Sequence, residues 1–143
     1  MTINHFAAFA VSAALIATSA AAQTGGRKLQ TNLTGAAEVP GPGDTDGSGS
    51  ATITVNPGQK RVCYKLSVAN IAPATAAHIH EAARTAAGPV KVTLGAPASG
   101  TSSGCVTVTR ALALDILKRP ADYYVNVHNA AFPGGAVRGQ LAK

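Results

Sequence analysis

Apolar and polar residues alternate without a break along Val62-Cys63-Tyr64-Lys65-Leu66-Ser67-Val68. Successive side chains of a β-strand point to opposite faces of a sheet. A period of two therefore predicts a strand with its apolar face in the core and its polar face outside.

Short segments with the same alternation lie on both sides of this strand, separated by turns rich in Gly, Pro, Asn and Ser. We expect them at residues 29–33, 51–55, 76–81, 90–94, 106–108, 123–127 and 137–141, with Val90, Val92 and Leu94 facing inward. Residues 111–118 do not keep the period of two, which predicts one short helical segment. Strands at this spacing, without the strand–helix–strand rhythm of parallel sheets, predict an all-β fold: an antiparallel Greek-key-like β-sandwich of roughly seven or eight strands.

The composition indicates a single, weakly charged domain. The chain has 143 residues, of which 12 are Lys or Arg and 6 are Asp or Glu, giving a formal net charge of +6. The basic residues are scattered and are not interleaved with aromatic ones, which disfavours nucleic-acid binding. Charged residues make up only 13% of the chain, which excludes a highly charged disordered protein and a coiled coil.

The beginning of the chain has the order of a secretory signal peptide. An uncharged apolar run, Phe6–Ala17, is followed by the small-residue site Ala20-Ala21-Ala22. The run is about 12 residues long, whereas a membrane-spanning helix needs roughly 20. We therefore expect a signal peptide at residues 1–22, one domain at residues 23–143 and no stable membrane span after cleavage. The protein would be periplasmic or secreted, and its unknown partners would be extracytoplasmic.

Cys63 and Cys105 are the two cysteines of the chain. Cys63 alternates with Val62, and Cys105 precedes Val106, so both point away from the apolar faces of their strands. Secretory compartments permit disulfides, and the shared orientation favours a Cys63–Cys105 disulfide over two unrelated thiols. No C-x-x-C motif is present, which indicates a structural crosslink.

Three histidines carry the strongest chemical signal. His78 and His80 are two residues apart, which places both on one face of a strand while Ile79 points into the core. His128 follows Val127 in another strand, so its side chain points to the face turned away from the core. Were the two strands neighbours, the imidazoles would converge on a metal ion with an open fourth position, and their nitrogens suit Cu, Zn, Fe or Ni. In the alternative reading, the histidines hydrogen-bond loops. Replacing His78 and His80 together with Ala should abolish tight metal binding and leave the fold intact, because both stand on the non-core face, whereas unfolding of that variant would favour the alternative reading.

Three segments resemble the CHRD domain family, a module first described in chordin. They are Leu33-Thr34-Gly35-Ala36-Ala37-Glu38-Val39-Pro40, Ala77-His78-Ile79-His80 with Gly88-Pro89-Val90, and Tyr123–His128 with Phe132–Leu141. The resemblance implies an immunoglobulin-like β-sandwich in a secreted or periplasmic protein.

A further resemblance concerns copper. His78-Ile79-His80 and Val127-His128 are similar to copper-binding motifs of copper–zinc superoxide dismutases, and Arg138 resembles in placement the arginine that guides the anion to copper there. The resemblance implies copper as the cofactor and a catalytic role for Arg138. The bridging histidine and the zinc ligands of that family have no counterpart here. In the alternative reading of Arg138, its side chain pins the last strand to a loop.

Three functions therefore remain open. The favoured one is a metal-binding CHRD module that holds copper through His78, His80 and His128. A copper-dependent redox enzyme would add turnover at that metal, with Arg138 drawing in a small anion. An adhesion or protein-binding module would use the histidines structurally.

The first testable prediction is that export removes residues 1–22, because the small-residue site ends there. The intact mass of the exported protein is expected to correspond to a chain that starts at Gln23. An exported species that retains residues 1–22 would contradict the prediction.

Overall fold

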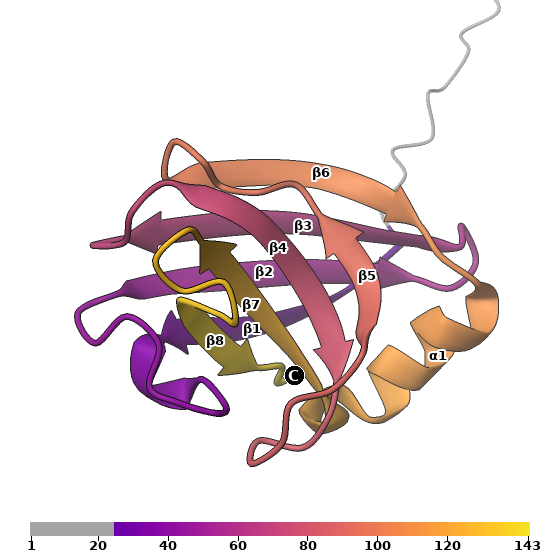
Figure 1. Cartoon of the computed structure of the whole chain (residues 1–143). Helices are drawn as coiled ribbons and strands as arrows, with labels where there is room; N and C mark the ends of the chain where they lie inside the picture. Colours follow the sequence, from indigo (N-terminus) through magenta and orange to yellow (C-terminus); the bar gives the residue numbers. More distant parts are fainter. Residues whose placement is uncertain (1–24) are drawn as a thin grey trace, which may run out of the picture.

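Eight antiparallel strands form one continuous sheet in a computed structural model that describes residues 25–143 (Figure 1). The expected signal peptide at residues 1–22 lies outside the described residues. The strands are β1 (Arg27–Thr34), β2 (Ser48–Asn56), β3 (Arg61–Ala69), β4 (Ala74–Glu81), β5 (Val90–Leu94), β6 (Thr101–Thr107), β7 (Tyr123–Asn129) and β8 (Val137–Gln140). The predicted all-β antiparallel fold is confirmed.

The sheet is folded over on itself into two layers. Its strand order is β5-β4-β7-β8-β1-β2-β3-β6, and its halves meet where Thr34 of β1 pairs with Arg138 of β8. Figure 1 shows β4 and β5 in front of β2 and β3. The end strands β5 and β6 approach one another. The result is a sandwich-like fold whose two layers are one sheet.

The core lies between the layers and is built by side chains of one parity from each strand. Ile53, Ile79 and Val125 are fully buried, although they come from three different strands. Val62, Tyr64 and Leu66 are also buried, as their alternation predicts. Burying a side chain of this size contributes about 1.5–3 kcal/mol, so the alternating pattern selects this arrangement of the sheet.

The predicted helical segment is α1 (Arg110–Lys118). Thr109 caps its start, because the Thr109 hydroxyl accepts a hydrogen bond from the amide of Leu112 at 3.1 Å. Ala113 and Ile116, three residues apart and fully buried, face the core. The helix packs at one end of the sandwich against β2 and β3 (Figure 1). Two 3-10 turns, η1 (Gly35–Ala37) and η2 (Pro120–Asp122), complete the described elements.

One strand prediction is wrong in part. Val92 and Leu94 of β5 face the core as expected, but Val90 is 48% exposed. The pairing of β4 with β5 shifts between Ile79 and His80, so Val90 leaves the alternation. A bulge of this kind re-aims a side chain without ending the strand. Within residues 25–143, no helix is long and apolar enough to cross a membrane.

The predicted Cys63–Cys105 disulfide is present. The two residues are directly opposite one another on β3 and β6, on the face turned away from the core. The bond links positions 42 residues apart. Since β6 is an end strand, the crosslink fixes an edge of the sheet to its interior.

We predict that replacing both cysteines with serine lowers the free energy of unfolding by about 4 kcal/mol, because the crosslink restricts a long loop in the unfolded chain. Urea denaturation of the oxidised wild type and of the double variant measures this change. Dithiothreitol should shift the wild-type midpoint toward that of the variant and leave the variant unchanged. Equal midpoints for the two oxidised proteins would contradict the prediction.

Candidate metal centre

The strands β4, β7 and β8 present polar side chains on the face turned away from the core. Ile79 and Val125 fill the core side of β4 and β7. The register sets His78 opposite Asn126, and Asn126 opposite Arg138. The outward-facing residues are His78, His80, Tyr124, Asn126, His128, Arg138 and Gln140. This face therefore combines ring nitrogens, two amides and a guanidinium in neighbouring positions.

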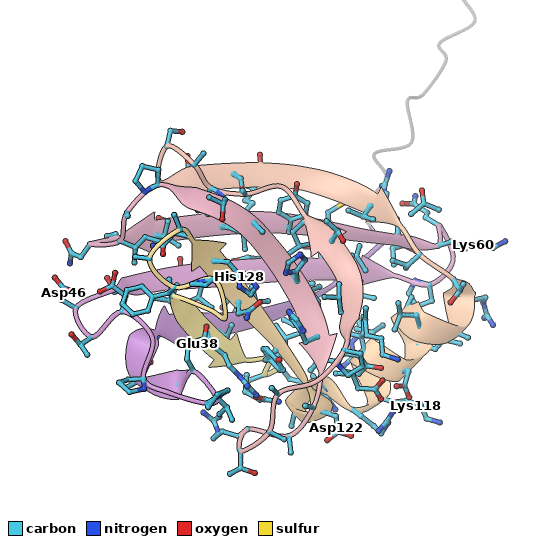
Figure 2. All side chains as sticks on the ribbon, viewed as in Figure 1. Glu38, Asp46, Lys60, Lys118, Asp122 and His128 are labelled. Carbon is cyan, nitrogen blue, oxygen red and sulfur yellow. A yellow bond between two sulfur atoms is a disulfide. The ribbon has the colours of Figure 1, made fainter. Side chains whose placement is uncertain are left out.

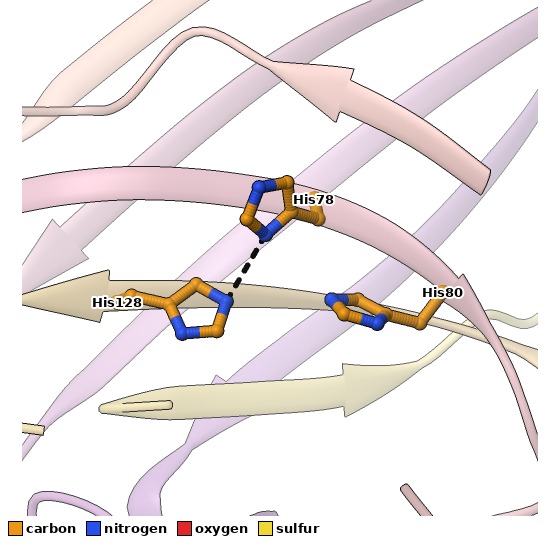
Figure 3. Close-up of side chains that lie close together, drawn as sticks. All are labelled: His78, His80 and His128. Carbon is orange, nitrogen blue, oxygen red and sulfur yellow. Dashed lines mark hydrogen bonds between the residues drawn. The ribbon is translucent and has the colours of Figure 1, made fainter. Parts of the chain in front are cut away.

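The structure brings the three histidines together. One nitrogen from each of His78, His80 and His128 lies within 4.8 Å of the other two. Figure 3 shows the rings turned toward a common centre, with the Nδ1 atom of His78 3.1 Å from the Nε2 atom of His128. Three nitrogens that each lie about 2 Å from one metal ion are within about 4 Å of one another. The observed spacing is slightly wider.

Backbone carbonyls orient two of the rings. The Nδ1 atom of His80 is 2.8 Å from the carbonyl oxygen of Gly88, and the Nδ1 atom of His128 is 3.0 Å from that of Pro133. A carbonyl oxygen only accepts hydrogen bonds, so each Nδ1 atom carries the proton and each Nε2 atom has a free lone pair in the neutral ring. Metal-binding histidines are oriented in the same way by outer hydrogen bonds.

His80 is only 8% exposed, and its Nε2 atom is buried without a hydrogen-bond partner. A buried polar atom without a partner costs about 1–3 kcal/mol. The sequence predicts the face on which His80 stands but not its burial. The premise that both histidines of β4 lie open on the outer face is wrong for His80, because the loop at residues 82–89 covers it. The expected small cost of removing both histidines stays a prediction.

The electrostatic environment favours the neutral forms of His78 and His128. Burial lowers the pKa of His78, and the neighbouring His128 and His80 lower it further. Burial also lowers the pKa of His128, partly offset by its hydrogen bond to Pro133. Neutral imidazole is the form that binds metal ions.

Arg138 is 1% exposed and points into this outer layer. Its guanidinium donates hydrogen bonds to the carbonyl oxygens of Ala86 at 2.9 Å and Ala83 at 3.0 Å. The guanidinium carbon lies 3.4 Å from the centre of the Tyr124 ring. The Tyr124 ring in turn stacks on His80, with centroids 4.8 Å apart. Arg138 thus connects β8 to the loop at residues 82–89. The Tyr124 ring, which lies between Arg138 and His80, packs against the His80 ring. The role of Arg138 in attracting an anion stays a prediction.

Glu38 is a buried acid that the sequence did not mark as functional. It is 6% exposed, and burial raises its pKa to about 7, opposed by the nearby Arg138 and by a hydrogen bond from Asn126. Gly135 has a positive φ of 137°, and a side chain there would collide with the Glu38 carboxyl group. In Figure 2, Glu38 and His128 lie in the same part of the molecule. In the sequence, the burial of Glu38 is indicated only by the motifs Glu38-Val39-Pro40 and Pro133-Gly134-Gly135. Both motifs are typical of loops, and a loop can fold over a sheet.

Comparison with known families agrees with the motifs quoted above. The model of the CHRD domain family matches residues 29–141. The chain belongs to the CHRD domain family. No curated protein and no solved structure was found to match the chain.

In this CHRD domain, the motifs that resemble the family meet at the candidate centre. The first motif supplies Glu38, the His-Ile-His motif supplies two imidazoles, and the last segment supplies His128 and Arg138. Glu81, the residue after His80, pairs instead with Lys91 at 2.8 Å and with Arg119 at 3.3 Å.

The buried carboxyl group generates a prediction about pH. The pKa of Glu38 is about 7 in the folded state against an ordinary 4.5. As pH rises between these values, the unfolded chain loses this proton first, so the free energy of unfolding falls. Between pH 4.5 and pH 7, the free energy of unfolding of the wild type should fall by roughly 3 kcal/mol relative to that of Glu38→Gln. Above pH 7 the difference should stay constant.

Urea denaturation from pH 4 to pH 8 checks this difference. Glu81→Gln is a suitable control, because Glu81 is paired and its pKa is lowered. That variant should keep the wild-type slope between pH 5 and pH 7. Parallel profiles for the wild type and Glu38→Gln would contradict the prediction.

Proposed function

We propose that this CHRD domain is a metal-binding module that acts outside the cytoplasm and holds one ion, copper in preference, through His78, His80 and His128. The observation that carries the proposal is the buried Nε2 atom of His80, which has no hydrogen-bond partner and stands beside the two other imidazoles (Figure 3). A metal ion would give this lone pair a partner.

The donor set supports a transition metal of this kind. Three imidazole nitrogens suit Cu, Zn, Fe or Ni, and for divalent ions the intrinsic affinity of such a site is highest for Cu(II). The rings of His80 and His128 are oriented by carbonyl oxygens before any ion binds. The three nitrogens already lie within 4.8 Å of one another, and nitrogens about 2 Å from one ion would lie within about 4 Å.

Two features support a location outside the cytoplasm. The Cys63–Cys105 disulfide is of a kind that persists in oxidising compartments. The first 22 residues have the order of a signal peptide. An exported protein would meet copper under the same conditions that keep its disulfide intact.

The prediction is that purified protein binds one equivalent of Cu(II) and that His78→Ala weakens binding by roughly 100-fold or more, since even outer-shell changes cost about 10–100-fold. Competition with a chelator of known affinity measures this change. At a free copper concentration about 100 times the dissociation constant, the wild type should gain roughly 2.7 kcal/mol of stability.

His78 is the ligand to replace first, because it is half-buried and its ring hydrogen-bonds to His128 and not to the backbone of a loop. Thr93→Ala is the matched control, since Thr93 is exposed and lies directly opposite His78 on β5. The control should bind copper as the wild type does. Equal copper affinity for all three proteins would refute the metal site and favour a module with structural histidines.

A further inference from the structure

The side chain of Asn126, an amide, lies among the three histidine rings. It is directly opposite His78 in the register of β4 and β7, and it is 2% exposed. Its Oδ1 atom is 3.0 Å from the Nε2 atom of His128. The same Nε2 atom is 3.1 Å from the Nδ1 atom of His78. An amide oxygen and two imidazole nitrogens therefore meet at one point.

Glu38 explains why the oxygen of the Asn126 amide faces the histidines. The Asn126 side chain hydrogen-bonds to the Glu38 carboxyl group and so stabilises its ionised form. Because this contact lowers the pKa of Glu38, it favours the ionised carboxylate, which accepts the bond from the amide nitrogen of Asn126. The Oδ1 atom then points the other way, toward His128.

This orientation leaves two acceptors in contact. The Nδ1 proton of His128 is committed to the carbonyl oxygen of Pro133, so the Nε2 atom presents a lone pair. The Asn126 Oδ1 atom faces that lone pair at 3.0 Å with no proton of either group between them. Two acceptors at this distance repel one another, and a cation between them converts the repulsion into attraction.

We propose that the Oδ1 atom of Asn126 is the fourth donor of the centre, which makes it a closed site of three nitrogens and one oxygen for a divalent ion. The inference rests on the proposed metal binding by the three histidines. Donors about 2 Å from a tetrahedral ion lie about 3.3 Å from one another. The separations of 3.0 Å and 3.1 Å at the Nε2 atom of His128 are close to this spacing.

A fourth protein donor changes what the centre can do. Catalytic metal sites keep a position open for water or substrate, whereas closed sites hold the ion. Asn126 takes the position that a small anion would need. The proposed centre therefore stores or carries copper, or stabilises the fold with it, and does not turn over superoxide. Glu38 acts as a positioning residue, because it fixes the Asn126 amide without touching the ion.

Azide tests whether the fourth position is open, because it binds exposed Cu(II) and gives a charge-transfer absorption band. Copper-loaded wild type should show no such band. Asn126→Ala should show one, and its Cu(II) affinity should fall by about 10–100-fold. Asn126→Asp keeps an oxygen at the same place, so it should exclude azide and bind Cu(II) at least as tightly as the wild type.

Asn129→Ala is the matched control for the loss of a buried amide. Asn129 lies on β7 and is 1% exposed, but its side chain hydrogen-bonds to the backbone of Ala72 and Phe132 and not to the histidines. This variant should be less stable and yet exclude azide. An azide band in Asn126→Ala and in Asn129→Ala alike would show a general loosening of the fold and would overturn the proposal.

The outcomes separate this inference from the proposed function. If the wild type binds copper tightly and also binds azide, the fourth position is open and Asn126 is not a ligand, while the three-histidine site stands. If the wild type binds copper no better than His78→Ala, the metal site itself fails and the inference fails with it. Should Asn126→Ala not fold, the azide responses of the wild type and Asn126→Asp still decide the question.

Discussion

The register between β4 and β7 is the constraint on which both the core and the candidate centre depend. It sets Ile79 opposite Val125, and both side chains are fully buried. The same register sets His78 opposite Asn126 on the other face. A slip of one residue would turn the histidines into the core and the apolar side chains outward. The free energy of burying the core therefore also holds the donor atoms in place.

A second, polar layer covers the outer face of these strands. Arg138 holds the loop at residues 82–89 through the carbonyl oxygens of Ala83 and Ala86, and Gln140 donates to the carbonyl oxygen of Ala82 at 2.7 Å. Burying a guanidinium is costly, and these carbonyls together with the Tyr124 ring offset that cost. The loop in turn supplies the Gly88 carbonyl that orients His80. The geometry of the centre thus depends on residues that do not reach it.

Local periodicity predicted the strands, the helix near residue 110, the disulfide and the shared face of the histidines. These features depend on which face of a strand each residue occupies. That face can be predicted from the alternation of apolar and polar residues next to it in the sequence. The burial of His80 and Glu38 was missed, because it depends on loops that fold back from distant parts of the chain. Asn126 was passed over for a different reason: its strand phase was predictable, but the significance of its amide oxygen depends on Glu38, 88 residues earlier in the chain.

Anomalous diffraction at the copper absorption edge, from crystals of the copper-loaded protein, tests the central claim most directly. The account predicts one strong peak about 2 Å from the Nδ1 atom of His78 and from the Nε2 atoms of His80 and His128. A map without a peak among these three rings, with the hydrogen bond between His78 and His128 intact, would contradict it.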